Sequence, residues 1–262
     1  MKRVVSFILV LCFALLGMKP VFANSMQGYY FRDDGSVYYD IENYNRNIEK
    51  EQNMVSPYTT KTAAPFVSIT RYPQITAYHC GPASAYSVLD SLGITVTATT
   101  KQLYFHEDCV NATSCSHGCP KNYTSPQVTL GTAMGTTYSS GTDIDRIRST
   151  INAYIGNNYY ADYHITNNEA GQVDFKNKVS STLEDGHPVI IWVHANKLDK
   201  YNGDPKFNDG HYVCVYSINL NTETVGISDC NYSSKYGKKY TATVADVVDA
   251  MHRSNGANNL IW

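Results

Sequence analysis

The sequence lacks an excess of charge of either sign. It contains 21 Lys and Arg against 23 Asp and Glu, which gives a formal net charge of −2. A nearly neutral chain has no strong attraction to phosphate backbones, so we do not expect nucleic acid as a partner. Hydrophobic residues make up 43% of the chain and charged residues only 17%, which excludes a protein that is disordered throughout.

Long hydrophobic runs and glycine or proline repeats are also lacking. The mean hydropathy is −0.33, and the 262 residues include 17 Gly and 9 Pro, which excludes a multi-span membrane protein and a collagen-like repeat. The longest apolar stretch, from Val4 to Met18, is short for a hydrocarbon layer ~30 Å thick. The composition therefore predicts a globular protein with one large domain or two small ones.

The apolar stretch near the start has the three parts of a secretory signal peptide. Two basic residues precede it, and Val21-Phe22-Ala23 follows it as a cleavage sequence. We expect residues 1–23 to be removed; an uncleaved anchor is the alternative, which Lys19 and Pro20 disfavour because they interrupt the run. Cleavage leaves 18 basic and 23 acidic residues, so we expect a mildly acidic, secreted or cell-surface protein without stable membrane insertion.

The rest of the chain divides by composition at about residue 63. Residues 24–62 are polar and rich in Tyr, with a hairpin pattern around Asp33-Asp34-Gly35-Ser36. They carry too few apolar residues to fold alone. We interpret them as an N-terminal extension that packs on the main domain or stays mobile, with a propeptide as a related hypothesis. Residues 63–262 are expected to form the main domain.

Helical patterns come first in the main domain and strand patterns follow. Apolar spacing predicts helices over 82–92, over 142–156 with Thr142 as the cap, and before Gly186. Strands are expected at 188–193, 211–218 and 224–229, and a closing helix at 243–251. The short turn at 219–223 predicts antiparallel pairing of the last two strands. Helices followed by an antiparallel sheet indicate an α+β fold.

Chemically useful side chains gather at two places in this layout. Cys80 stands at the predicted N-terminus of a helix, where unpaired N–H groups and the helix dipole lower the pKa of a thiol. His211 opens one strand of the hairpin and Asp229 ends its partner, so they are expected within a residue or two of facing each other. A cysteine beside a histidine that a carboxylate orients is a nucleophilic pair.

Four segments of the chain occur in a recognisable order over roughly residues 63–252. They are Gln74 with Cys80-Gly81-Pro82-Ala83-Ser84, then Gly186-His187-Pro188-Val189-Ile190, then Gly210-His211-Tyr212-Val213, and finally Asp229. Together they resemble the papain-like cysteine peptidases, specifically the bacteriocin-processing, or double-glycine, peptidase-like branch.

This resemblance implies a papain-like fold and a role for each of four residues. Cys80 is the implied nucleophile, His211 the general base and acid, and Asp229 the residue that orients the imidazole. Gln74, together with the backbone N–H of Cys80, is the implied oxyanion hole. No metal or organic cofactor is required, and the expected partner is a peptide or protein substrate.

Three functions are compatible with these residues. The first is a secreted cysteine peptidase that hydrolyses a peptide or isopeptide bond through a thioester. The second is a transpeptidase or acyltransferase, in which an amine replaces water. The third is a noncatalytic, wall-associated binding module whose cleft the N-terminal extension blocks. The sequence favours the first.

The other histidines and cysteines leave several alternatives. His79, His187 and His194 are rivals for the base. We expect His79 to point away from the adjacent Cys80, His187 opens a strand after a glycine, and His194 closes that strand without a carboxylate in register. In an exported protein, a disulfide within the insert is favoured over zinc, and the connectivity stays open. The insert residues concerned are His106, Cys109, Cys115, His117 and Cys119.

Cys214 and Cys230 depart from the pattern of the branch. Branch members usually carry an apolar residue at the first position and proline at the second. The hairpin count places the two cysteines nearly opposite one another, so a cross-strand disulfide that braces His211 and Asp229 is a further expectation.

Overall fold

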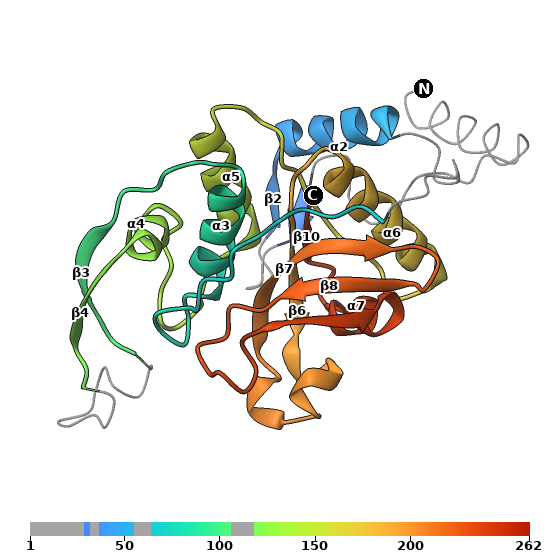
Figure 1. Cartoon of the computed structure of the whole chain (residues 1–262). Coiled ribbons are helices and arrows are strands. Elements are labelled where there is room, and N and C mark those ends of the chain that lie inside the picture. The colour runs from blue at the N-terminus through green and yellow to red at the C-terminus, as the bar shows by residue number, and fades with distance from the viewer. Residues whose placement is uncertain (1–28, 32–36, 55–63, 106–117) are drawn as a thin grey trace, which may run out of the picture.

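A six-stranded antiparallel sheet forms the centre of the protein in a computed structural model that describes residues 29–31, 37–54, 64–105 and 118–262 (Figure 1). Its strands in spatial order are β5 (Asp162–Tyr163), β10 (Leu260–Ile261), β6 (Val189–His194), β7 (Gly210–Asn219), β8 (Thr224–Ser228) and β9 (Lys239–Thr243). Two antiparallel pairs lie outside this sheet: β1 (Tyr29–Phe31) with β2 (Val37–Tyr39), and β3 (Thr99–Leu103) with β4 (Lys121–Ser125).

Helices precede the sheet in the main domain and cover both of its faces. The α-helices are α2 (Ile41–Asn53), α3 (Cys80–Ser91), α4 (Pro126–Ala133), α5 (Ile144–Ile155), α6 (Glu169–Glu184) and α7 (Val244–Ala250). Three short 3-10 helices lie between β6 and β7: η2 (Ala195–Lys197), η3 (Asp199–Tyr201) and η4 (Pro205–Phe207). The predicted α+β class is confirmed, with the cysteine at a helix N-terminus and the antiparallel sheet after it.

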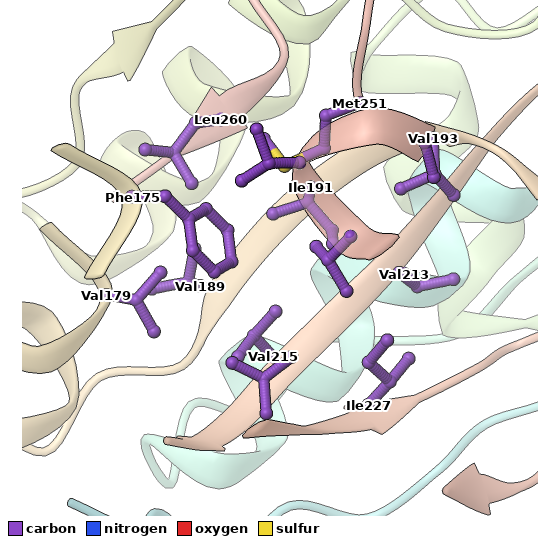
Figure 2. Packing of buried hydrophobic residues seen from close by; sticks show 14 of the residues in the cluster. Phe175, Val179, Val189, Ile191, Val193, Val213, Val215, Ile227, Met251 and Leu260 are labelled. Atoms are coloured by element: carbon purple, nitrogen blue, oxygen red, sulfur yellow. The ribbon is translucent and has the colours of Figure 1, made fainter. Parts of the chain in front are cut away.

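The core consists of two layers because successive strand residues point to opposite faces of the sheet. On one face, Val189, Ile191 and Val213 pack with α6 and α7, and Figure 2 shows Phe175 and Val179 of α6 against them. The other face carries Ile190, Trp192, Tyr212 and Cys214, which pack with α3 and α5. The sheet therefore carries one helical layer on each face.

Most predicted boundaries differ from the observed ones by one or two residues, and two of these differences concern the helices nearest the site. Helix α3 begins at Cys80, two residues earlier than predicted, so the cysteine belongs to the first turn. The residue that precedes α5 as its cap is Asp143, and the prediction of Thr142 is wrong because the Thr142 hydroxyl bonds with that of Thr136 at 2.7 Å. Gly156 ends α5 with φ of 72°, which a residue with a side chain rarely adopts.

Helix α2 attaches part of the N-terminal extension to the edge of the sheet. The side-chain amide of Asn43 accepts from the N–H of Asp162 at 2.9 Å and donates to its carbonyl at 3.0 Å, as a neighbouring strand would. Asn47 also donates to the Asp162 carbonyl and accepts from the indole N–H of Trp262 at 2.8 Å. The polar residues of α2 therefore pair with the outer strand β5.

Charged groups join the same region to α5 and α6. Arg148 of α5 forms ion pairs with Asp40, which caps α2, at 2.6 Å, and with the fully buried Asp162 at 2.9 Å. Lys178 of α6 bonds to Glu51 of α2 at 2.6 Å. Within the part of the chain that the structure describes, no helix is long and apolar enough to cross a membrane.

Candidate active site

The Cys80 side chain lies where the helical layer meets the start of β7. It is 7% exposed, and its sulfur accepts hydrogen bonds from the backbone N–H groups of Gly81 and Tyr212. One of these donors belongs to the first turn of α3 and the other to β7. Both donors favour a negatively charged sulfur, as does the positive end of the helix dipole.

His211 and Asp229 come from adjacent strands of the sheet. His211 is the second residue of β7, and Asp229 directly follows β8. The ring Nε2–H donates to Asp229 Oδ1 at 2.9 Å, and the same ring is hydrogen-bonded to the Cys80 thiol. Since Nε2 is engaged by the carboxylate, Nδ1 is the nitrogen that faces the sulfur. The structure thus brings Cys80, His211 and Asp229 into one line.

The start of β7 is fixed by a close contact with the preceding strand. A Cβ atom at Gly210 would overlap the indole ring of Trp192, so only glycine fits there. The guanidinium of Arg253 covers the same indole at 4.3 Å from its centroid. This packing fixes the position of the next residue, His211, at the start of β7.

The electrostatics of the three groups favour a thiolate and an imidazolium. Burial on its own would raise the pKa of Cys80, but the hydrogen bond and charge of His211 outweigh burial and lower it. For His211, burial acts to lower the pKa, while the charge and hydrogen bond of Asp229, with Cys80, raise it to about 10. The pKa of Asp229 is lowered although burial opposes this, chiefly by the charge of His211.

Asp229 has further donors that sequence reasoning missed. It is fully buried, and its Oδ1 also accepts from the backbone N–H of Asn231 at 2.8 Å. Its Oδ2 accepts from the hydroxyl of Tyr201 at 2.7 Å and from that of Tyr240 at 3.4 Å. Among the 22 Tyr of the chain, nothing in the sequence distinguishes these two.

Arg71 holds the backbone around the carboxylate. Its Nε donates to the carbonyl of Asp229 at 2.6 Å and its Nη2 to the carbonyl of Asn231 at 2.7 Å. Arg71 precedes α3 in the chain and Asp229 follows β8, so the guanidinium joins the two layers beside the site. The sequence contains no signal for this contact because the partners are backbone atoms.

Gln74 is buried close to the site, but its amide hydrogens are engaged elsewhere. Its Nε2 donates to the carbonyls of Thr76 at 2.8 Å and Ala77 at 2.9 Å. Two carbonyl acceptors fix the orientation of the amide, because an oxygen placed there would repel both of them. The side chain therefore braces the loop before Cys80, and its place in an oxyanion hole stays a prediction.

The three rival histidines lie in other surroundings. His79 is buried, its Nδ1 lies 2.5 Å from the Thr76 hydroxyl and its Nε2 faces Gly131 in α4. Burial lowers the pKa of His79 to about 4, so this ring stays neutral. His187 stacks on Tyr159 with ring centroids 3.9 Å apart, and His194 bonds to the carbonyl of Asn208. None of these ring contacts involves a carboxylate side chain.

The expected disulfide between Cys214 and Cys230 is not formed, and both thiols are free. Cys214 faces Ser228 in the β7–β8 register, so Cys230 lies two residues further along. Each thiol has a carbonyl instead: Cys214 donates to Ser84 at 3.4 Å and Cys230 to Tyr212 at 3.3 Å. The prediction placed the two residues too close because cysteines two residues out of register are not directly opposed.

Only part of the predicted insert can be assessed. His106, Cys109, Cys115 and His117 lie outside the described residues, as do the predicted signal peptide and residues 24–28, 32–36 and 55–62 of the extension. Cys119 is described, and its thiol is free and accepts from the N–H of Phe105 at 3.0 Å. In the described ranges there is no cluster of three or more metal-ligating His, Cys, Asp or Glu residues.

Comparison with known protein families identifies one that covers most of the chain. The family model described as Peptidase_C39 like family matches residues 66–255, a span that contains Cys80, His211 and Asp229. A solved structure, a fragment of Prevotella intermedia prointerpain A that carries a cysteine-to-alanine mutation, is similar at 14% identity with a TM-score of 0.47. That similarity covers 85% of this chain and 81% of the other. No curated protein matches the sequence.

Proposed function

Because this chain belongs to the Peptidase_C39 like family and is a papain-like cysteine peptidase, we propose that it hydrolyses a peptide or isopeptide bond with Cys80, His211 and Asp229. The observation that carries the proposal is the hydrogen-bonded line from the Cys80 thiol through His211 to Asp229. A thiol, an imidazole and a carboxylate in that order form an activated nucleophile.

The first half of the reaction cleaves the substrate. The Cys80 thiolate attacks the carbonyl carbon, a C–S bond forms, and the carbonyl electrons move onto oxygen. When this intermediate collapses, the C–N bond breaks and His211 gives its Nδ1 proton to the leaving amine. The products are a free amine and a thioester on Cys80, with a neutral imidazole.

The second half releases the acyl group. The neutral His211 takes a proton from water, and the resulting hydroxide attacks the thioester carbon. The C–S bond breaks, a carboxylic acid leaves, and the thiolate–imidazolium pair is restored. Asp229 stabilises the imidazolium and keeps Nε2–H directed at its own Oδ1, so that Nδ1 always faces the sulfur.

The oxyanion of each step needs hydrogen-bond donors. We assign the Cys80 backbone N–H to this role, because it lies at the N-terminus of α3, where N–H groups have no partner within the helix. Gln74 is the second assigned donor. Its amide would exchange the Thr76 or Ala77 carbonyl for the substrate oxygen, which is the more negative acceptor in the transition state.

Replacement of the nucleophile tests the proposal. Cys80→Ala is expected to abolish peptide turnover and the fast alkylation by iodoacetamide at pH 6, while the circular-dichroism spectrum stays unchanged. The matched control is Cys214→Ala, since burial raises the pKa of the Cys214 thiol to about 12 and keeps it unreactive.

The control variant should keep both turnover and fast alkylation. Turnover by the Cys80→Ala protein would sink the proposal. Mass analysis of the products with an added amine separates the two catalytic outcomes: hydrolysis gives a free acid, whereas transfer to the amine gives a new amide.

The proposed compartment is extracytoplasmic, on the sequence of residues 1–23. N-terminal sequencing of protein recovered from the culture medium or cell surface of an expressing strain is expected to begin at Asn24. Protein found only in the cytoplasm with an intact Met1 would contradict this assignment.

A further inference from the structure

The two oxygens of Asp229 have different partners, and only Oδ1 faces the imidazole. Oδ2 accepts its shortest hydrogen bond, 2.7 Å, from the hydroxyl of Tyr201. We propose that Tyr201 is a positioning residue, which holds the Asp229 carboxylate in the orientation that supports the thiolate–imidazolium pair. This inference rests on the proposed function, because it concerns how the same three groups are kept in line.

The carboxylate depends on this hydroxyl because it is removed from water. Asp229 is fully buried, so each of its oxygens must find its partners within the protein. Oδ1 has two strong partners, His211 Nε2 at 2.9 Å and the Asn231 N–H at 2.8 Å. For Oδ2, the other hydroxyl, that of Tyr240, is 3.4 Å away and therefore weak. Without Tyr201, Oδ2 keeps only this long contact among the residues that the structure describes.

The ring of Tyr201 is fixed by aromatic neighbours. It is 1% exposed and stacks on Tyr236 with centroids 4.7 Å apart and an interplanar angle of 3°. Phe207 packs edge-on against both rings, at 4.8 Å and 4.6 Å. Such packing fixes the position of the Tyr201 hydroxyl. The hydroxyl therefore determines the orientation of the Asp229 carboxylate, and not the reverse.

The connection between β6 and β7 contains Tyr201 and leads directly into His211 at the start of β7. Tyr201 ends η3, and its N–H donates to the carbonyl of Leu198 at 2.8 Å. The same connection, drawn in orange at the lower edge of Figure 1, continues into Gly210 and His211. One stretch of chain therefore places the imidazole and also the hydroxyl that orients its carboxylate partner.

The other ionisable groups around Asp229 do not replace this contact. Arg71 binds the backbone carbonyl of Asp229 and not its carboxylate. Lys200 is half-buried and acts on Asp229 only through its charge. The titratable or charged groups that face Asp229 are His211 and Cys214 from β7, Tyr201 and Lys200 from η3, Tyr240 from β9, Cys230 after β8, and Arg71 before α3.

The pH dependence of Cys80 alkylation reports the pair directly and needs no substrate. The rate constant rises in a lower step when the thiolate–imidazolium pair forms, and in an upper step when the imidazolium loses its proton. If the carboxylate turns away from His211, the imidazolium loses its support and the thiolate loses the imidazolium. The midpoint of the lower step then moves to higher pH, and the midpoint of the upper step moves to lower pH.

The test compares Tyr201→Phe with Tyr236→Phe. Both remove one hydroxyl from the same stacked pair, but the Tyr236 hydroxyl binds Asp204 at 3.2 Å and not Asp229. For Tyr201→Phe we expect the lower step to move up by about one pH unit, so that alkylation at the wild-type midpoint slows several-fold and kcat falls about tenfold. Tyr236→Phe should stay within about twofold of wild type with both steps in place.

Three outcomes overturn the inference while leaving the proposed function intact: unchanged steps in Tyr201→Phe, an upper step that moves up, or equal shifts in Tyr236→Phe. A wild-type protein without a lower step instead overturns the proposed function.

In an Asp229→Asn background, Tyr201→Phe should add little, because the two residues act as one unit. Should Tyr201→Phe fail to fold, Tyr240→Phe takes its place, with a smaller shift of the lower step in the same direction expected and no shift counting against the inference.

Discussion

At the scale of single residues, the reactivity of Cys80 depends on one neighbour more than on its helix. Burial acts to raise its pKa, and the hydrogen bond and charge of His211 are the largest contributions that lower it. The charged pair is therefore expected above the lowered pKa of Cys80 and until the imidazolium deprotonates at about pH 10.

Removal of the imidazole should reverse this balance. In His211→Asn, burial dominates, and we expect the alkylation step of Cys80 to move above the ordinary value of a thiol, near 8.5. The matched control is His194→Asn, whose ring bonds to the Asn208 carbonyl and should leave the step unchanged. A His211→Asn protein that is alkylated as fast as wild type at pH 6 would show that the helix N-terminus alone activates the sulfur.

Gln74 can be separated from its bracing role by comparison with Gln127. Both side chains hold the loop before Cys80, since Gln127 donates to the Pro73 carbonyl at 2.8 Å and accepts from Ile75 N–H at 3.2 Å. For Gln74→Ala we expect kcat to fall by about 100-fold with alkylation unchanged, because alkylation forms no oxyanion. An equal loss in Gln127→Ala would mean that loop bracing explains the effect.

Residue roles were predictable only where a residue type is chemically special. A cysteine before Gly-Pro, a histidine at a strand start and an aspartate at the end of the partner strand stand out in the sequence. Tyr201 does not, because its role follows from where the β6–β7 connection folds. Cys214 and Cys230 misled the prediction because their separation depends on a register that only coordinates give.

At the scale of elements, α2 is one of several elements that the sequence patterns did not predict, together with β3, β4, α4, β5 and β10. Its buried side chains are the amides of Asn43 and Asn47, so the helix has no apolar stripe to reveal it. The helices and strands of the main core were predictable because their apolar residues recur at regular spacing, as in β6 and α5.

The attachment of α2 can be measured by a pair of substitutions in the same helix. Asn43→Ala removes two hydrogen bonds to the Asp162 backbone, and we expect it to lower the free energy of unfolding by about 2–3 kcal/mol. Asn45→Ala makes the same change at an exposed position and should stay within about 0.5 kcal/mol of wild type. Urea denaturation of both variants measures the difference; equal values would mean that α2 does not stabilise the β5 edge.

At the scale of the whole molecule, helix α2 contacts the sheet at an end different from the one that holds Cys80. Figure 1 places α2 at the upper edge and the β6–β7 connection at the lower edge. The polar partners of α2 belong to α5, β5, α6 and the C-terminal Trp262. These contacts favour a structural role for the helix over a blocked cleft.

Truncation distinguishes a structural extension from a propeptide. A chain that starts at Ala64 loses α2, uncovers the β5 edge and leaves the Trp262 indole without Asn47. Compared with a chain that starts at Asn24, we expect a lower melting temperature, a greater tendency to aggregate and no gain in activity. A truncated chain that is stable and faster would identify residues 24–63 as a propeptide.

At this scale the order of helices and sheet was predictable, but the contacts that join distant parts of the chain were not. The change from helical to strand spacing indicates the α+β class, and a short turn indicates the β7–β8 hairpin. The contact between Asn47 and Trp262 joins residues 215 positions apart through polar atoms, which no local pattern encodes.

The division of the site between two layers has a consequence for how the protein loses its reactivity. The sulfur is carried by a helix, and the groups that ionise it are carried by a hairpin, joined by contacts such as that of Arg71 with Asp229. Each layer can keep its own backbone bonding while the seam between them opens slightly. The reactivity of Cys80 therefore depends on the contact between the helix and the hairpin. We expect it to be lost when this contact first opens, before either part unfolds.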